Sequence, residues 1–253
     1  MTDPLGDVLP QLRAASSRLQ SELMVIGAHA RDAVLEELGA PVGKETQDVD
    51  VVIGVPHGVT YHELVRSLGT PVNDMGFTFE IEGVPVDVLP WIEHLDEAAG
   101  FSPARGIVLD VRGQFEVYQS ARRVELEPGL FVRLPTAEGL VVLKIIAWNI
   151  RQTQTVKDAR DLHPLLTAIA GAHLDHERVW DADLLERTNH DPDAAAWLLI
   201  GQQARLEAPD ASAVCAEILA TSGPALLRDM GLADTLGMFA LRLAALQCGL
   251  TEL

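Results

Sequence analysis

The sequence predicts an α+β fold, in which a front part of mixed strands and helices is followed by an all-helical back part. Short apolar segments with strand-like alternation occur in the front part, among them Asp48–Ile53 and Val84–Leu89. After Pro135 the apolar residues recur at helical spacing almost without interruption. This change of texture predicts a domain boundary, with an α/β domain over residues 1–134 and a helical domain over residues 135–253.

Apolar spacing, with Gly and Pro at the ends of segments, defines the elements expected in the front part. Glu82-Gly83 is typical of a hairpin connection between two strands. Pro90 is expected to end the second strand of that hairpin, because proline has no backbone N–H for a ladder. In chain order, the prediction is a helix over residues 5–21, a strand Leu23–Ile26, a helix His29–Leu38, a loop Gly39–Gln47, a strand Asp48–Ile53, a helix Tyr61–Leu68, strands Phe77–Ile81 and Val84–Leu89, and two or three short strands between Gly106 and Val132.

The back part is expected to consist of helices joined by short connections. Cys215 and Cys248 lie in helix-like apolar stretches and are interpreted as reduced thiols of the core. The expected helices are Thr136–Ile150, Thr155–Gly171, Ala182–Arg187, Pro192–Leu206, Ala211–Thr221 and a last one from Ala225 to the end.

Charge and composition narrow the class of protein. The 253 residues have a formal net charge of −18, which does not favour unaided nucleic-acid binding, since phosphate neutralisation needs clustered Lys and Arg. The segment Phe101–Arg160 differs, with nine basic residues against six acidic ones, and is either a face suited to phosphates or a solvated helix surface. No apolar run reaches the roughly 18 residues that span a bilayer, and the N-terminus does not resemble a signal peptide. A cytoplasmic protein without a membrane segment is expected.

Three aspartates on predicted strands are the strongest candidates for chemistry. Asp48 and Asp50 are two residues apart, so on a strand they point to one face, where they repel each other unless a cation lies between them. Asp87 stands between Val86 and Val88, where an isolated acid is costly unless it is paired or binds a metal. Because Mg²⁺ prefers oxygen ligands, the pattern predicts a two-metal phosphoryl-transfer site. The competing interpretations are an exposed strand end for the first two and a hydrogen-bonded edge position for Asp87.

The segment before these aspartates is typical of a phosphate-binding turn. A strand ends in Gly27 and passes directly into a helix, whose first backbone N–H groups attract phosphate. Gly27 would let a triphosphate approach the backbone, followed by Ala28 and His29 at the start of the helix. Arg31 and Asp32 are either a pair that supports the site or a simple surface pair on the helix.

Several short sequence blocks, by their residues and by their order along the chain, resemble the polymerase-β-like nucleotidyltransferase superfamily. They are similar in particular to predicted bacterial nucleotidyltransferases related to the AbiEii/MenT toxins of type IV toxin–antitoxin systems, and Arg31-Asp32 also resembles the head of CCA-adding enzymes. Ala28 departs from the Gly-Ser or Gly-Gly of many members, so one hydroxyl contact to phosphate is missing. The blocks, within roughly residues 20 to 165, are Gly27–Asp32, Thr46–Asp50, Pro85–Pro90, Gly139–Arg151 and Lys157–Leu162.

The resemblance implies transfer of NMP from an NTP to a hydroxyl acceptor. Asp48 and Asp50 would hold two Mg²⁺ ions, and Asp87 would share one of them and accept the proton of the attacking hydroxyl. Attack on the α-phosphate would be in line, with pyrophosphate leaving. Lys144 would reach the triphosphate and stabilise the charge that moves to pyrophosphate. The front part would then have the polymerase-β-like fold, a mixed sheet flanked by helices.

The residues of the back part have structural alternatives. Lys144, Trp148 and Arg151 share one helix face. Lys144 could instead extend to solvent along an apolar stem, and Trp148 could be core packing. The resemblance implies that Lys157 and Asp158 complete the nucleotide site, as part of the Lys157–Leu162 block.

Asp158 has a second interpretation that is purely local. The stretch from Thr155 to Asp158 fits a capping box, with Thr155 as the N-cap of the helix. Lys157 and Asp161 would then be an ion pair on one helix face.

The acceptor stays open at the level of sequence. The resemblance implies the 3′ end of a tRNA, in a toxin with a partner antitoxin, and the acidic body instead suits a small polycationic acceptor of the aminoglycoside type. The third alternative, prompted by Ala28, is a degenerate module that binds nucleotide without turnover.

Overall fold

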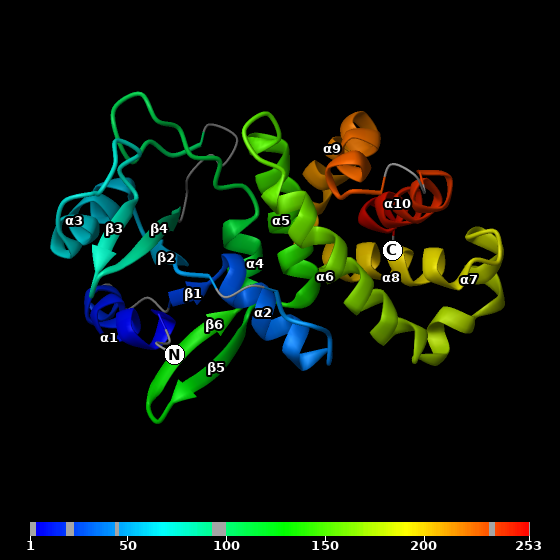
Figure 1. Cartoon of the computed structure of the whole chain (residues 1–253), viewed down its shortest axis with the longest axis horizontal. Helices are drawn as coiled ribbons and strands as arrows, with labels where there is room; N and C mark the ends of the chain where they lie inside the picture. Colours follow the sequence, from blue (N-terminus) through cyan, green and yellow to red (C-terminus); the bar gives the residue numbers. More distant parts are fainter. Residues whose placement is uncertain (1–3, 19–22, 44–45, 93–99, 233–235, 253) are drawn as a thin grey trace. The chain divides into compact units, whose positions relative to one another are not determined.

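The protein is described here by a computed structural model, which covers residues 4–18, 23–43, 46–92, 100–232 and 236–252 (Figure 1). The chain forms two compact units. One unit comprises Met1–Ala33 and Val42–Pro135, and the other comprises Val34–Pro41 and Thr136–Leu253. The second unit thus includes residues 34–41, which a single boundary at residue 134 leaves in the first. The division into an α/β domain over residues 1–134 and a helical domain over residues 135–253 stays a prediction.

A mixed sheet forms the centre of the first unit (Figure 1). In the part of the chain that the structure describes, it has six strands in the order β3-β4-β2-β1-β6-β5. β2 is parallel to β4 and β1 is parallel to β6, and the other neighbours are antiparallel. The strands are β1 (Leu23–Val25), β2 (Val49–Val55), β3 (Thr78–Ile81), β4 (Val84–Ile92), β5 (Arg122–Glu127) and β6 (Leu130–Leu134).

The first unit also contains the helices α1 (Pro4–Ser17), α2 (Gly27–Glu37), α3 (Gly58–Leu68) and α4 (Gln114–Ser120). α1 and α3 contact each other and pack against strands of the sheet, and α4 contacts β4. The burial of the side chains alternates along β4, so its two faces differ. Val86 and Val88, on one face, are fully buried. The side chains on the other face are half-buried: Asp87, Leu89 and Trp91. The half-buried face of β4 therefore carries the polar and aromatic side chains.

β4 does not end at Pro90, as the sequence suggested, but continues to Ile92. The backbone N–H of Val88 donates to Phe77 at 2.8 Å, so the nitrogen of Pro90, two residues later, points toward the same edge. β3 begins at Thr78 and is antiparallel to β4, so no strand partner faces Pro90 on that side. The missing N–H therefore breaks no ladder bond, and the other edge of β4 stays paired with β2.

The segment 106–132 contains the helix α4, where only strands were predicted. Its sequence alternates apolar residues such as Phe115 and Val117, a spacing that is also typical of a strand. Gly113, with a φ of 77°, supplies the left-handed turn that starts this helix. The two strands that follow, β5 and β6, were expected.

The second unit is all helical in its described residues, which confirms the predicted α+β arrangement of a mixed sheet followed by helices. Thr136 caps α5 by accepting a hydrogen bond from the backbone N–H of Gly139 at 3.0 Å, and Asp191 caps α8 in the same manner. The elements are α5 (Ala137–Arg151), α6 (Lys157–Leu174), the short 3₁₀ helix η2 (Glu177–Trp180), α7 (Ala182–Arg187), α8 (Pro192–Glu207), α9 (Pro209–Asp229) and α10 (Leu236–Thr251).

Two expectations for the second unit were wrong in detail. The predicted break between Thr221 and Ala225 does not occur, because α9 runs through Pro224. An interior proline removes one helical hydrogen bond, and the buried Leu219 and Leu226 on either side keep the segment in the core. The single helix expected from Ala225 to the end is also wrong, since α9 ends at Asp229 and α10 begins at Leu236. The parts of the expected elements over residues 19–21, 44–45 and 233–235 lie outside the described residues.

Both cysteines are free thiols, with Cys215 buried and Cys248 half-buried. Among the described residues, no helix is both long and apolar enough to cross a membrane.

Candidate active site

Asp50 on β2 and Asp87 on β4 are direct partners in the parallel ladder. Paired residues of neighbouring strands project from the same sheet face, and the strands are about 4.8 Å apart. Both side chains are half-buried, while Val49 and Val51 beside Asp50 are fully buried. The structure therefore brings two of the three predicted carboxylates side by side on one face of the sheet.

The third predicted carboxylate, Asp48, lies one residue before β2 begins. Its Oδ1 accepts a hydrogen bond from the hydroxyl of Thr46. The side chain of Asp48 is thus oriented by the loop that leads into β2, and it is half-buried. The strand geometry used to predict a common face for Asp48 and Asp50 applies only to Asp50.

Gly27, the first residue of α2, packs directly against Asp50. A Cβ on Gly27 would overlap Oδ2 of Asp50 and would lie 2.7 Å from its Cγ. The φ of Gly27 is +66°, a backbone conformation that favours glycine. The backbone of Ile26 also donates to the carbonyl of Asp50 at 2.9 Å. The carboxylate of Asp50 is therefore held at the N-terminus of α2, whose partial positive charge favours anions.

The other predicted residues of the turn have mixed surroundings. Ala28 is buried, with 4% exposure, so its methyl group belongs to the core and would not contact a ligand. His29 is half-buried. Arg31 is buried and its Nε donates to Oδ1 of Asp32 at 2.7 Å, so the predicted pair forms, but below the surface. A Cβ on Gly43 would lie 3.3 Å from Nη2 of Arg31, which places this guanidinium against the loop before β2.

Tyr61 on α3 supports the carboxylate pair and was not singled out by sequence. The fully buried phenol donates to the backbone carbonyl of Val88, next to Asp87, at 2.7 Å. Burial raises the pKa of Tyr61, and the charge of Asp87 adds to the rise, so the phenol stays a protonated donor. Only its place in the helical pattern of α3 is visible in the sequence.

Lys144, on α5 in the second unit, is the buried centre of a group of charges that extends to the exposed Arg151. Its Nζ lies 2.7 Å from Oδ2 of Asp161 and 3.5 Å from Oδ1 of Asp158, both on α6. Arg151 also pairs with Asp158, at 2.8 Å. The lysine side chain is only 9% exposed, so the alternative in which it extends to solvent is wrong. Trp148, on the same helix face, is fully buried and donates to Asp229 at 2.9 Å, as expected for core packing.

The predicted capping box at the start of α6 is not formed. Val156 is the N-cap and has no side-chain capping bond. Thr155 accepts from the backbone N–H of Lys157 at 3.1 Å, but Asp158 turns to Lys144 and Arg151 instead of back to the turn. Lys157 is exposed.

We searched the described residues for groups of side chains that could hold a metal ion. No group of three or more His, Cys, Asp and Glu side chains within them is arranged to hold a metal ion. The donors of the Asp50–Asp87 pair are carboxylate oxygens, which is the chemistry that Mg²⁺ prefers. A site completed by Asp48 stays a prediction.

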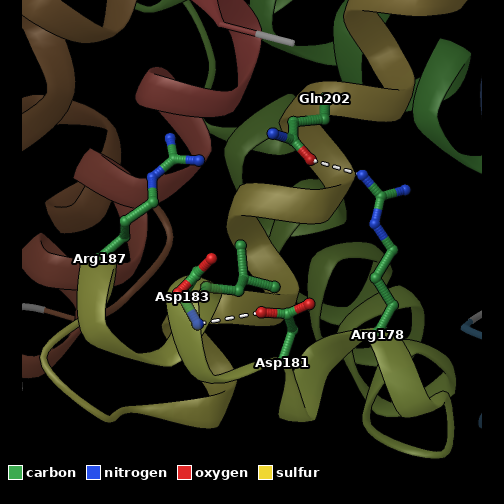
Figure 2. A pocket seen from close by; sticks show the side chains of 6 residues that line it. Arg178, Asp181, Asp183, Arg187 and Gln202 are labelled. Atoms are coloured by element: carbon green, nitrogen blue, oxygen red, sulfur yellow. Dashed lines mark hydrogen bonds between the residues drawn. The ribbon is translucent and has the colours of Figure 1, made fainter.

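A hollow of about 210 Å³ lies in the second unit, lined by residues of η2, α7 and α8. Figure 2 shows Arg178 donating to Gln202, at 3.1 Å, and the carboxylate of Asp181 accepting from the backbone N–H of Asp183, at 2.9 Å. Arg187, which also lines the hollow, pairs with Glu252, which does not, at 2.7 Å. None of the residues predicted for the site lines it.

Comparisons with known proteins give partial structural similarities. No family model and no curated protein matches the chain. A crystal structure of ANT(2″)-Ia in complex with adenylyl-2″-tobramycin is 18% identical, with a TM-score of 0.38, over 74% of this chain and 93% of that chain. A solution structure of the antibiotic-resistance factor ANT(2″)-Ia is 19% identical, with a TM-score of 0.40, over 74% and 95%.

A third similar structure is an antigenic nucleotidyltransferase-like protein from Paracoccidioides brasiliensis. It is 19% identical, with a TM-score of 0.42, over 71% of this chain and 91% of that chain. TM-scores between 0.38 and 0.42 are too low to assign an activity. The function has to be argued from the residues of this chain.

Proposed function

We propose that this chain is a nucleotidyltransferase that transfers NMP from an NTP to a hydroxyl acceptor at the pair Asp50 and Asp87. The observation that supports this most is the position of Asp50, which is in register with Asp87 and in contact with Gly27 at the start of α2. Two carboxylates and a helix N-terminus meet there. The carboxylates suit a divalent cation, and the helix N-terminus suits the phosphates that such a cation carries.

The residues of the first unit have distinct roles in this proposal. Asp50 and Asp87 would hold Mg²⁺, with Asp48 as a further ligand; the cation would neutralise phosphate charge and lower the pKa of the acceptor hydroxyl. The backbone N–H groups of Gly27, Ala28 and His29 would orient the triphosphate.

Asp87 lies on the side of the pair away from β1 and α2, since β4 is separated from β1 by β2. This position suits it to accept the proton of the attacking hydroxyl. Tyr61 holds the backbone beside Asp87 and so keeps its carboxylate in register with Asp50.

Lys144 is proposed to act on the leaving group, as the sequence resemblance implies. Lys144 and Arg151 balance Asp158 and Asp161, so the group is neutral and each charge has a partner. The pairing with Asp158 and Asp161 holds the position of the Lys144 ammonium group. In this proposal the ammonium of Lys144 stabilises charge on the leaving pyrophosphate, while Asp158 and Asp161 fix its direction. Lys157, which is exposed, would add a further contact to the nucleotide.

The transfer reaction tests the proposal directly. The full chain is incubated with each of the four NTPs, labelled at the α-phosphate, together with Mg²⁺ and a mixture of RNA and small polycations that carry hydroxyl groups, of the aminoglycoside type. The label is expected to move to an acceptor with release of pyrophosphate. Asp50→Asn should lower the rate by at least about 100-fold, a loss typical of removing one electrostatic contact to the transition state.

Asp74→Asn is the matched control, because Asp74 is an exposed aspartate of the same unit outside the proposed site. It should leave the rate unchanged. Full transfer by Asp50→Asn, or an α-phosphate label that stays on the nucleotide and reaches no acceptor, would contradict the proposal.

Two classes of acceptor are proposed, and the net charge of the chain favours one of them. A net charge of −18 favours a polycationic small molecule, since opposite charges attract at long range. A tRNA 3′ end would instead need the basic residues between Phe101 and Arg160 to contact phosphates, with binding that weakens steeply as salt rises. Labelled product in the small-molecule fraction supports the first class, and labelled RNA supports the second.

A further inference from the structure

Three aromatic rings gather on the face of the sheet that carries Asp50 and Asp87. The ring of Trp91, on β4, has its centroid 5.0 Å from that of Phe115 and 4.9 Å from that of Tyr118, both on α4. All three side chains are half-buried, in contrast to the fully buried Val86 and Val88 on the opposite face of the same strand. The three residues are called the aromatic cluster below.

The register of the strands places this cluster on the same face as the carboxylate pair. Along β2 and β4 the paired residues are Asp50 with Asp87 and, four residues later, Gly54 with Trp91. Residues separated by an even number along a strand project from one face, so Trp91 lies about 13 Å along the sheet from Asp87.

Gly54 makes room for the indole of Trp91. A Cβ on Gly54 would lie 2.8 Å from Nε1 of Trp91, too close for any side chain. The ring of Trp91 therefore lies across the backbone of β2, on the face that carries Asp50.

An arginine adjoins the cluster on the same face. Val52 pairs with Met24, and Met24 pairs with Arg133 on β6, so Arg133 shares the face of Asp50 and Trp91. Its guanidinium carbon is 4.7 Å from the ring centroid of Tyr118, and its Nη1 donates to the carbonyl of Ala121 at 3.2 Å. A cation stacked on an aromatic ring beside further half-buried rings is a surface suited to planar, electron-rich groups.

We propose that the aromatic cluster is a stacking subsite for the base of the NTP, an inference that rests on the proposed function. The triphosphate would lie at Gly27, on one side of the carboxylates, and Trp91 lies further along the strands on the other side. A nucleotide held with its phosphates at α2 would thus extend its ribose and base toward the aromatic cluster. Stacking on an aromatic side chain tolerates every base, so the subsite would give affinity without strict base selection.

The test compares a ligand that has a base with one that lacks it. Binding of a non-hydrolysable ATP analogue and of inorganic tripolyphosphate, each with Mg²⁺, is measured on the full chain. Trp91→Leu should weaken binding of the ATP analogue by about 5- to 150-fold, the range that a base–aromatic stack gives. Binding of tripolyphosphate should not change. Trp180→Leu, which alters an exposed tryptophan of the second unit, is the control and should affect neither ligand.

Two further measurements keep the inference open to refutation if Trp91→Leu does not fold. Phe115→Leu should show the same selective loss, and tryptophan emission of the unaltered chain should be quenched by the ATP analogue but not by tripolyphosphate. Equal loss for both ligands, or no loss for either, would overturn the stacking subsite. If the stacking subsite is refuted but tripolyphosphate still binds and still requires Asp50, the proposed function stands. If neither ligand binds to the unaltered chain, the stacking subsite and the proposed function are both contradicted.

Discussion

The carboxylate of Asp50 occupies the space that a side chain on Gly27 would fill. This contact joins the start of α2 to the middle of the sheet, and it holds a negative charge at a helix N-terminus. Glycine is required there twice, by the φ of +66° and by the closeness of the carboxylate. The two requirements can be separated, because Gly39, just beyond the end of the same helix, has the same φ and no atom within 4 Å of its would-be Cβ.

Gly27→Ala should therefore be more damaging than Gly39→Ala. Both variants incur the strain of a left-handed backbone, about 1–2 kcal/mol, but only Gly27→Ala also displaces Asp50. The expected result is an additional loss of stability in thermal unfolding and a loss of NMP transfer with Gly27→Ala, against normal transfer with Gly39→Ala. Equal behaviour of the two variants would show that the contact with Asp50 does not matter.

Tyr61→Phe should destabilise the sheet at Asp87. The change leaves the buried carbonyl of Val88 without its phenolic donor, which costs about 1–3 kcal/mol. In a chain of this size each kcal/mol lowers the melting temperature by about 2–4 °C. Thr167→Val is the comparison, because it removes an exposed hydroxyl that donates to the carbonyl of His163, and it should change stability by less than about 0.5 kcal/mol.

Lys144→Met should be strongly destabilising, because it leaves Asp158 and Asp161 buried with one cation fewer. Breaking a buried ion group by removing one member costs about 3–5 kcal/mol. Arg160→Ala, an exposed change on α6, the helix that carries Asp158 and Asp161, should cost under about 0.5 kcal/mol. Adding Asp161→Asn to Lys144→Met should restore part of the stability. If transfer activity returns together with stability, Lys144 has a structural role alone; if activity stays lost, Lys144 acts on the nucleotide.

Ionisation of Glu207 should lower the free energy of unfolding as the pH rises. Burial raises the pKa of this carboxyl in the folded chain, hydrogen bonds from Gln203 and Thr136 oppose the rise, and the charge of Glu138 adds to it. A carboxyl group whose pKa is higher in the folded chain than in the unfolded chain stabilises the fold fully when the pH is below the unfolded-state pKa, near 4.5. This stabilisation is lost as the pH rises through the folded-state pKa. Glu207→Gln should therefore unfold at a higher temperature than the unaltered chain at pH 7, with the difference vanishing near pH 4. Glu217→Gln, on the exposed face of α9, should show no such trend.

The sequence predicted the parts of the fold that rest on repeating local patterns. β2 and β4 are visible as runs of β-branched residues, and α7 and α8 are visible by helical spacing together with their aspartate caps. The continuation of β4 through Pro90 was hidden, because it depends on where β3 begins, a property of pairing. α4 was missed because alternating Phe115 and Val117 suit a strand as well as one helical turn.

The residues of the candidate site could be predicted from the sequence, but the contacts between them could not. Asp50 was singled out by its spacing of two residues from Asp48, and Asp87 as an isolated acid in an apolar strand. The pairing of Asp50 with Asp87 needs only that the two strands be neighbours. The contact of Asp50 with Gly27, the support of Val88 by Tyr61 and the pairing of Asp158 with Lys144 join residues far apart in the chain. No local spacing encodes such contacts, and without them Asp158 was equally well explained by a capping box.

The most direct test is to measure whether Asp50 and Asp87 hold one divalent cation together with a nucleotide. Mn²⁺ is titrated into the full chain in the presence of a non-hydrolysable ATP analogue, and bound ion is counted by electron paramagnetic resonance. The account predicts tight, nucleotide-dependent Mn²⁺ binding that is lost in Asp50→Asn and in Asp87→Asn alike and is kept in Asp74→Asn. Mn²⁺ binding that is equal in the unaltered chain and in both site variants would contradict it.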